Sequence, residues 1–358
     1  DVEVRYRRLD KRRIGFELGD HDPARPLRID PRIGLASFFG AGGNERIEDA
    51  AFDAAGALWV VGQTNSPAFP LPPAGFPSPR RGASDVFASK FVRQVDAAGG
   101  ETWSLVTTLF LGGSGRDRAA GIGIDAGGRV YVIGDTQSRD FPVSNDGEQR
   151  DLAGGSDAFV TVLRQSDFPF FSLSGEETAP AQGAFTNYEI EYSTLVGGAG
   201  EETAVDGFVA PFADDRGLPC AILAAQSNSS DLRTTTFAFQ ERNAGGTDAY
   251  FGVFCRQTGQ GYPLTYGSFL GGSREEAGAA MAIAASGSFC VGTRTTSGGL
   301  PASGLQRGLA GATEAYLACF SPIRRRFGLP FLYRETGSTY WGGSAGETLV
   351  DLAIEDIG

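Results

Sequence analysis

Few residues in this chain have the side chains that covalent catalysis requires. His21 is the only histidine, so a Ser-His-Asp or Cys-His arrangement has one possible base. The stretch GGSAG at 342–346 matches the nucleophile-elbow pattern, but that motif works at a strand-to-helix turn, and no helical spacing follows it. A zinc site built from histidines is excluded, and the cysteines lack CxxC spacing. The sequence therefore predicts a protein that is not an enzyme, with no catalytic residue, metal site or cofactor.

One acidic residue recurs in a fixed local pattern of glycine, a small residue, Ser or Thr, the acid, Ala or Val, and an aromatic residue. The copies are GASDVF at 82–87, GGSDAF at 154–159, GGTDAY at 245–250 and GATEAY at 311–316, with the acids Asp85, Asp157, Asp248 and Glu314. A calcium site is one interpretation, because calcium takes several oxygen ligands. An acid that anchors its loop through backbone N–H groups is the other. We favour the anchor, because a structural device must be copied into every repeat whereas a function seldom is.

A second marker shows that these acids belong to an internal repeat. A pair of glycines returns at Gly112-Gly113, Gly197-Gly198, Gly271-Gly272 and Gly342-Gly343, with an earlier relative in FFGAGG at 38–43. Residues 38–56 align with residues 110–128 without a gap. Because the markers keep the same order each time, the chain is a repeat protein.

The segments between the markers have the composition of β-strands. RVYVIGDT at 129–136 and DAFVTVL at 157–163 are rich in β-branched and aromatic residues, and no run has helical spacing. DAAG at 53–56 and DAGG at 125–128 suit tight turns. The pattern in each unit therefore predicts four antiparallel strands, which we term a to d in chain order. The a strands of the four units are expected to begin near Glu45, Asp117, Glu202 and Glu276. Such sheets must stack on one another, and four strands per unit favour a β-propeller.

The units resemble a known family, the bacterial β-propeller repeat called SBBP. Units of that family look like YSTYLGGSG, a GIAVD-type strand, AYVTGYT, a DFP element and GGxDAFVAKL. The matching segments here are YSTLVGGAG at 192–200, GIGID at 121–125, VYVIGDT at 130–136, DFP at 140–142 and GGSDAFVTVL at 154–163. The resemblance covers roughly residues 33–358, although the third unit departs from it at PCAILAAQS and lacks the proline of DFP. It implies an all-β propeller in a secreted or surface protein and carries no catalytic motif.

The chain divides into an N-terminal segment, 1–32, and the propeller repeats, 33–358. Residues 2–10 and 12–20 both alternate apolar and polar side chains, which predicts a β-hairpin. Its arginines fit a docking patch for an acidic partner, but an edge hairpin protected by charge is the interpretation that we favour. The segment is similar to the end of the β-rich region that precedes these repeats in long secreted bacterial proteins.

The two ends of the repeat region carry surplus strands. LVDLAIED at 349–356 is an a strand with no b, c or d after it, and IGLASFF at 33–39 is a d strand with nothing before it. We expect them to form a split fifth blade, with the hairpin 2–19 in its middle, because closure removes open edges. The alternative is that the chain forms part of a six- or seven-bladed ring.

The four cysteines lie on neighbouring strands of the expected blades. Cys220 and Cys255 fall on strands b and c of the third unit, and Cys290 and Cys319 on those of the fourth. An even number in a secreted context favours two disulfides in these pairings. Four buried thiols acting as small apolar side chains are the alternative.

Charge and the unrepeated segments bear on partners. A net charge of −12 argues against a nucleic-acid partner, and no apolar run is long enough for a signal or a spanning segment. Of two insertions, 70–82 is proline-rich, and 165–189 carries Phe168, Phe170, Phe171 and Phe185 in a polar setting. Clustered exposed aromatics mark a partner interface, and an aromatic cluster folded over the outer edge of the blade is the equal alternative.

Two functions fit these observations. The first is a non-enzymatic structural or protein-interaction module of a bacterial assembly, located outside the cell, on its surface or in the periplasm. The second is a carbohydrate-binding or glycoside-processing propeller whose central funnel brings carboxylates together, with Trp59, Trp103 and Trp341 as sugar contacts. Trp59 is in register with Tyr131 on a b strand, so we expect it in the core.

Overall fold

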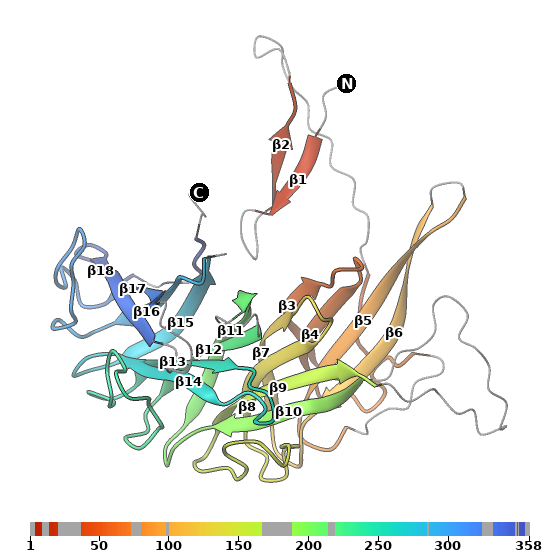
Figure 1. Cartoon of the computed structure of the whole chain (residues 1–358), viewed down its shortest axis with the longest axis horizontal. Coiled ribbons are helices and arrows are strands. Elements are labelled where there is room, and N and C mark those ends of the chain that lie inside the picture. Colours follow the sequence, from red (N-terminus) through yellow and green to blue (C-terminus); the bar gives the residue numbers. More distant parts are fainter. Residues whose placement is uncertain are drawn as a thin grey trace.

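The protein is described by a computed structural model. The structure describes residues 4–8, 14–20, 37–72, 80–97, 100–166, 188–213, 219–284, 286–323, 332–347, 349 and 351–354. All regular elements in these residues are strands, and four of the five sheets have four strands each (Figure 1). No helix among them could cross a membrane.

Each repeat forms one antiparallel sheet, termed a blade, in which strands that follow one another in the chain are paired. Blade 1 contains β3 (Glu45–Phe52), β4 (Leu58–Thr64), β5 (Asp85–Val95) and β6 (Glu101–Leu111). Blade 2 contains β7 (Asp117–Ile124), β8 (Val130–Thr136), β9 (Asp157–Gln165) and β10 (Tyr188–Val196). Blade 3 contains β11 (Glu202–Ala213), β12 (Pro219–Ser227), β13 (Asp248–Cys255) and β14 (Leu264–Leu270). Blade 4 contains β15 (Glu276–Ile283), β16 (Phe289–Thr295), β17 (Glu314–Ile323) and β18 (Leu332–Trp341). The predicted strand content and the four expected starts of the a strands are confirmed.

The a strands β3, β7, β11 and β15 are the inner strands of an arc of blades (Figure 1). Each of them carries a β-bulge close to its start, at the register shifts Ile47/Asp49, Ala119/Gly121, Ala204/Asp206 and Ala277/Ala279. A bulge bends a strand and increases its twist. In β15 the bulged residue is Gly278, which adopts a φ of 72°.

Three apolar clusters fill the spaces between successive blades. Trp59 and Val61 of blade 1 pack with Val132 of blade 2, and Ile133 of blade 2 packs with Leu223 of blade 3. A third cluster joins Phe251 of blade 3 to Phe289 of blade 4. Each sheet is thus buried on a face by its neighbour, as expected for units that cannot stand alone. Trp59 is fully buried, which confirms its place in the core.

The N-terminal hairpin is confirmed, because β1 (Val4–Arg8) pairs with β2 (Ile14–Leu18) in antiparallel register. It forms a sheet of its own, and in Figure 1 it stands apart from the blades, beside the open side of the arc between blade 4 and blade 1. Residues 37–39 and 351–354 have no strand structure. The described strands do not join these segments into one sheet, so the split fifth blade stays a prediction.

Both predicted disulfides are present. Cys220 and Cys255 face each other on β12 and β13, and Cys290 and Cys319 face each other on β16 and β17, each pair with a Cα–Cα distance of 4.0 Å. No free cysteine occurs in the described residues. Two disulfides suggest an oxidising compartment outside the cytoplasm.

Replacing Cys220 and Cys255 together by alanine should lower the free energy of unfolding by about 2–4 kcal/mol, because the bond closes a long loop in the unfolded chain. Urea denaturation monitored by circular dichroism measures the change. The double alanine variant at Cys290 and Cys319 is the matched comparison, since its loop is of similar length, 29 against 35 residues. Unchanged unfolding midpoints in both variants would contradict the prediction.

Candidate functional site

In blades 2, 3 and 4 the acid at the start of the inner strand is buried in the junction with the preceding blade. Asp117 is fully buried and accepts hydrogen bonds from Gly113 N at 3.0 Å, from Ser138 Oγ at 2.9 Å and from Thr136 Oγ1. Two segments that are distant in sequence, the double-glycine turn and the end of strand b, therefore converge on one carboxylate. Because it has several hydrogen-bond donors, this carboxylate can stay buried without a cation beside it.

The same arrangement recurs in the other blades. The acid accepts a backbone N–H from the glycine turn and a hydroxyl from the end of strand b. The backbone partners are Ala41 for Glu45, Gly198 for Glu202 and Gly272 for Glu276. The hydroxyl partners are Thr64 at 2.9 Å, Ser227 at 2.6 Å and Thr295 at 2.6 Å. Since every copy has the same partners, the acid is a structural device of the repeat.

The acids at the start of strand c hold the preceding loop, as the anchor interpretation predicts. Asp157 accepts hydrogen bonds from Ala153 N at 2.9 Å and Gly154 N at 3.2 Å, and from Gln149 Nε2 at 2.6 Å. Gln149 Oε1 in turn accepts the N–H of Gly197, the first glycine of the next turn. The corresponding acids Asp85, Asp248 and Glu314 also accept backbone N–H groups. Among the described residues no group of three or more His, Cys, Asp or Glu side chains could hold a metal ion.

The first glycine of each turn lies against the strand-c acid, and Gly112 also lies against the acid of the next inner strand. A Cβ on Gly112 would lie 2.4 Å from Asp85 Oδ1 and 2.6 Å from Asp117 Oδ2. Neither carboxylate can move without breaking its hydrogen bonds. The recurrence of glycine at this position therefore follows from its close approach to the strand-c acid.

Gly112→Ala should destabilise the protein by about 1–3 kcal/mol, the usual cost of overpacking a buried position. Gly42→Ala is the matched control, because a Cβ there meets nothing within 4 Å. Thermal unfolding of both variants measures the difference. Equal stability of the two variants would show that the junction tolerates a Cβ.

Burial dominates the electrostatics of these acids. It raises the pKa of Asp117 to about 6, the charge of Asp85 adds to the rise, and the hydrogen bond from Thr136 opposes it. Burial likewise raises the pKa of Asp248 above its usual range, and Glu276 adds to that rise. The buried Oδ1 atom of Asp248 has no hydrogen-bond partner among the described residues. A carboxyl group whose pKa is raised in the folded protein binds its proton more tightly there than in the unfolded chain. The free energy of unfolding therefore depends on pH.

Asp117 contributes stability that is fully present below its ordinary pKa of 3.8 and is lost as the pH rises through about 6. The free energy of unfolding of the wild type, relative to that of Asp117→Asn, should therefore fall by about 2–3 kcal/mol between pH 4 and pH 7. Urea denaturation at both pH values tests this. For the exposed Asp140, hydrogen bonds from Ser114 lower the pKa, so Asp140→Asn should give a difference of the opposite sign. A pH-independent difference for Asp117→Asn would contradict the assignment.

A central cavity of about 340 Å³ lies between the inner strands. The segments that line it are 49–51 of β3, 122–124 of β7, 208–209 of β11, 281–283 of β15 and 352–354 of the C-terminal tail. Asp49 is the one carboxylate among the residues that line it. Its oxygens accept the N–H groups of Ala50 at 2.8 Å and Ile122 at 3.1 Å. The described lining thus contains one carboxylate and no pair of carboxylates.

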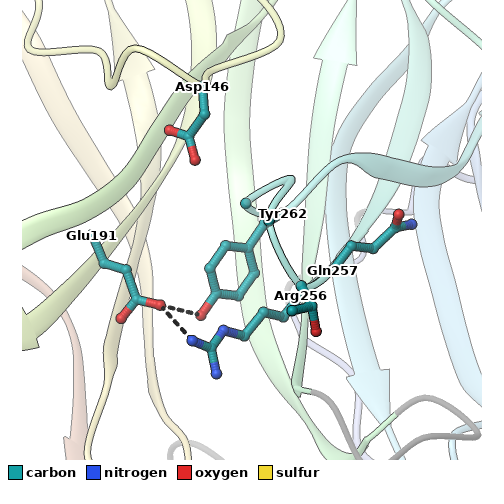
Figure 2. Close-up of a pocket in the computed structure, with 8 residues that line it drawn as sticks. Asp146, Glu191, Arg256, Gln257 and Tyr262 are labelled. Atoms are coloured by element: carbon teal, nitrogen blue, oxygen red, sulfur yellow. Dashed lines mark hydrogen bonds and ion pairs between the residues drawn. The ribbon is translucent and has the colours of Figure 1, made fainter.

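A second cavity of about 480 Å³ lies between blades 2 and 3, and its lining is polar (Figure 2). Glu191, the bulged residue of β10, points into it. Its carboxylate is held by Arg129 at 2.8 Å, Arg256 at 3.4 Å and Tyr262 at 3.5 Å. Asp146 approaches from the facing loop of blade 2 (Figure 2). Carboxylates, a guanidinium group and a phenol suit a small polar ligand with several hydroxyl or charged groups.

The tyrosines extend this network into the interface between the blades. Tyr262 OH lies 3.3 Å from Tyr131 OH, which donates to Asp125 Oδ2 at 3.0 Å. Burial raises the pKa of Tyr262 to about 12 and also raises that of Tyr131. Both phenols therefore stay protonated at neutral pH and act as hydrogen-bond donors. Of these groups, Glu191 and Tyr262 line the cavity.

The residues singled out in the sequence lie in different places. Phe168, Phe170, Phe171 and Phe185, together with His21, lie outside the residues that the structure describes. Trp103 is half-buried, and Trp341 is exposed at the edge of blade 4. Neither tryptophan lines either cavity. The polar cavity was missed because its residues are not repeated and meet only across two blades.

Comparison with known proteins does not identify a family for this chain. A scan against protein-family models and a search of curated proteins found no match to this chain. The chain is thus an all-β protein of four four-stranded antiparallel sheets, held together at junctions of buried acids and stabilised by two disulfides.

Proposed function

We propose that this chain is a non-enzymatic protein-interaction module of a secreted or cell-surface bacterial assembly. The observation that carries the proposal is a pair of exposed apolar side chains on the inner strand of blade 1. Ile47 of β3 is 54% exposed, whereas the residues at the same position of β7 and β11, Ala119 and Ala204, are fully buried against the preceding blade. Phe52, at the end of β3, is 63% exposed. Large apolar side chains that are exposed next to one another on an inner strand are typical of a protein contact.

Three further observations support this proposal. The repeated acids accept hydrogen bonds within the junctions, so their role is structural. The disulfides fit a location outside the cytoplasm. The resemblance of the repeats to the SBBP family points to the same kind of protein, and the phenylalanines of the insertion 165–189 remain a proposed second contact.

A photo-crosslinking amino acid at position 47 should give one discrete adduct in the native envelope of the producing cell, because a partner covers the exposed Ile47 there. Val95, which is 56% exposed on β5, provides a control position of matched exposure. The adduct at position 47 should disappear when Phe52→Asp is added. Adducts of equal yield at both positions, or none at position 47, would contradict the proposal.

A carbohydrate-binding function is the second candidate, and the polar cavity between blades 2 and 3 favours it. Glu191, Asp146 and Arg256 offer the acceptors and donors that sugar hydroxyls use, and Tyr262 adds an aromatic ring. A glycan array that gives a hit abolished by Glu191→Gln would support this candidate. If the protein hydrolyses a glycoside and Glu191→Gln abolishes that activity, the protein is an enzyme and the proposal of an interaction module is wrong.

A further inference from the structure

One glycine N–H group is bound differently in blade 3 from the other blades. In blades 1, 2 and 4 the N–H groups of Gly82, Gly154 and Gly311 donate to the strand-c acid of the same blade, at 3.3, 3.2 and 2.9 Å. Gly245 has the same place in blade 3, three residues before the acid. Its N–H donates instead to Asn243 Oδ1, at 2.9 Å. The strand-c acid of blade 3 therefore lacks a donor that its equivalents have.

Asn243 is the residue that causes this difference. Its Nδ2 donates to Ser227 O at 3.0 Å and to Gly246 O at 3.2 Å, and this arrangement directs its Oδ1 to the N–H of Gly245. The residues at this place in the other blades are Arg80, Leu152 and Leu309. None of them has a side-chain acceptor, so in those blades the glycine N–H stays with the acid.

Asp248, the strand-c acid of blade 3, is left with one oxygen that has no donor. Its Oδ2 atom accepts the N–H of Ala244 at 2.8 Å and Gln240 Nε2 at 2.9 Å. Its Oδ1 atom is buried and has no hydrogen-bond partner among the described residues. Gly271 lies against this atom, since a Cβ on that glycine would be 2.4 Å away from it. A buried carboxylate oxygen without a donor is costly, whereas a protonated oxygen carries a donor of its own.

The acceptor for such a proton is Glu276, the buried acid at the start of β15. Its N–H donates to Thr247 O at 2.7 Å, and its side chain is in hydrogen-bonding contact with that of Asp248. The carboxylate of Glu276 also accepts Gly272 N at 2.7 Å and Thr295 Oγ1 at 2.6 Å. These two donors favour the ionised form of Glu276, so the proton belongs on Asp248.

The groups around this pair do not offset its charge. The ion pairs formed by the described residues include neither Asp248 nor Glu276. Tyr340 of β18 donates to Ser297 O at 2.8 Å in the same junction and stays neutral, because burial raises its pKa. The charged residues of the adjoining turns are exposed, and they are Glu241, Arg242, Arg274 and Glu275. Burial raises the pKa of Asp248, and the charge of Glu276 adds to the rise.

We propose that Asp248 and Glu276 share one proton, and that this proton makes the junction between blades 3 and 4 sensitive to pH. While the proton is bound, Asp248 donates it to Glu276, and the turn that ends at Glu276 is held. When the proton is lost, two buried carboxylates face each other and the turn loosens. The apolar cluster that contains Phe251 and Phe289 keeps the two blades together, so the change is local. This response to pH is independent of what the interaction module binds.

Hydrogen–deuterium exchange of the full chain tests the proposal at the N–H of Gly272, which donates to Glu276. Because the pKa of Asp248 is raised from 3.8, its contribution to stability is fully present below 3.8 and is lost as the pH rises through the raised value. The protection of Gly272, corrected for the intrinsic effect of pH on exchange, should fall at least ~10-fold between pH 5 and pH 8, since one pKa unit corresponds to a tenfold change. Carbon-13 NMR should show the Asp248 carboxyl group titrating in this range.

Two variants separate the shared proton from a merely structural role. Asp248→Asn should keep at pH 8 the protection that the wild type has at pH 5, because the Nδ2 of asparagine donates to Glu276 without a proton that titrates. A structural role of Asp248 would instead lower the protection at both pH values. Asn243→Leu, which copies blade 2, should return the N–H of Gly245 to Asp248 and remove most of the pH dependence. Asn145→Leu, at an exposed asparagine between β8 and β9, is the matched control and should leave it unchanged.

Unchanged protection of Gly272 between pH 5 and pH 8, or an Asp248 carboxyl group that titrates below pH 5, overturns the proposal. Equal pH dependence in Asn243→Leu and in the wild type also overturns it. Thermal unfolding verifies that the variants fold. If Asp248→Asn does not fold, the titration of the wild type and the result for Asn243→Leu decide.

Discussion

The buried carboxylate at each blade junction is the interaction on which the rest of the structure depends. A carboxylate in an apolar setting needs donors from several directions, and Asp117 draws them from the glycine turn before it and from the end of strand b after it. The acid therefore fixes where one blade ends and the next begins. The apolar clusters provide most of the burial, but they are tolerant of small shifts. The directional hydrogen bonds set the register of the blades.

Much of this could be predicted from the sequence because it is repeated. The double glycine, the strand-c acid and the strand composition recur four times, so each copy supports the interpretation of the others. The disulfides followed from placing Cys220 and Cys255 on neighbouring strands of one unit. The role of Asp117 was not predicted. Its position marked only the start of a strand, and the convergence of three donors on it is a property of folded geometry.

The polar cavity between blades 2 and 3 could not be predicted from the sequence. Glu191 points into it because of a bulge in β10, and Arg256 and Tyr262 come from the connection between β13 and β14 of the next blade. A bulge shifts a side chain to the other face of its strand, and it leaves no clear mark in the residue types. Contacts that occur once, between loops of two blades, give no internal pattern to compare.

The placement of the two disulfides has a mechanical consequence. Both join strands b and c inside a blade, with loops of 35 and 29 residues between the cysteines, and the described cysteines form no bond across a junction. Under tension, the chain can separate at its junctions while the loops of blades 3 and 4 stay closed. Blades 1 and 2 have no such limit and can unravel to their full contour length. A pulled chain would therefore extend unevenly, with its N-terminal half acting as the compliant part and its C-terminal half as the stiff one.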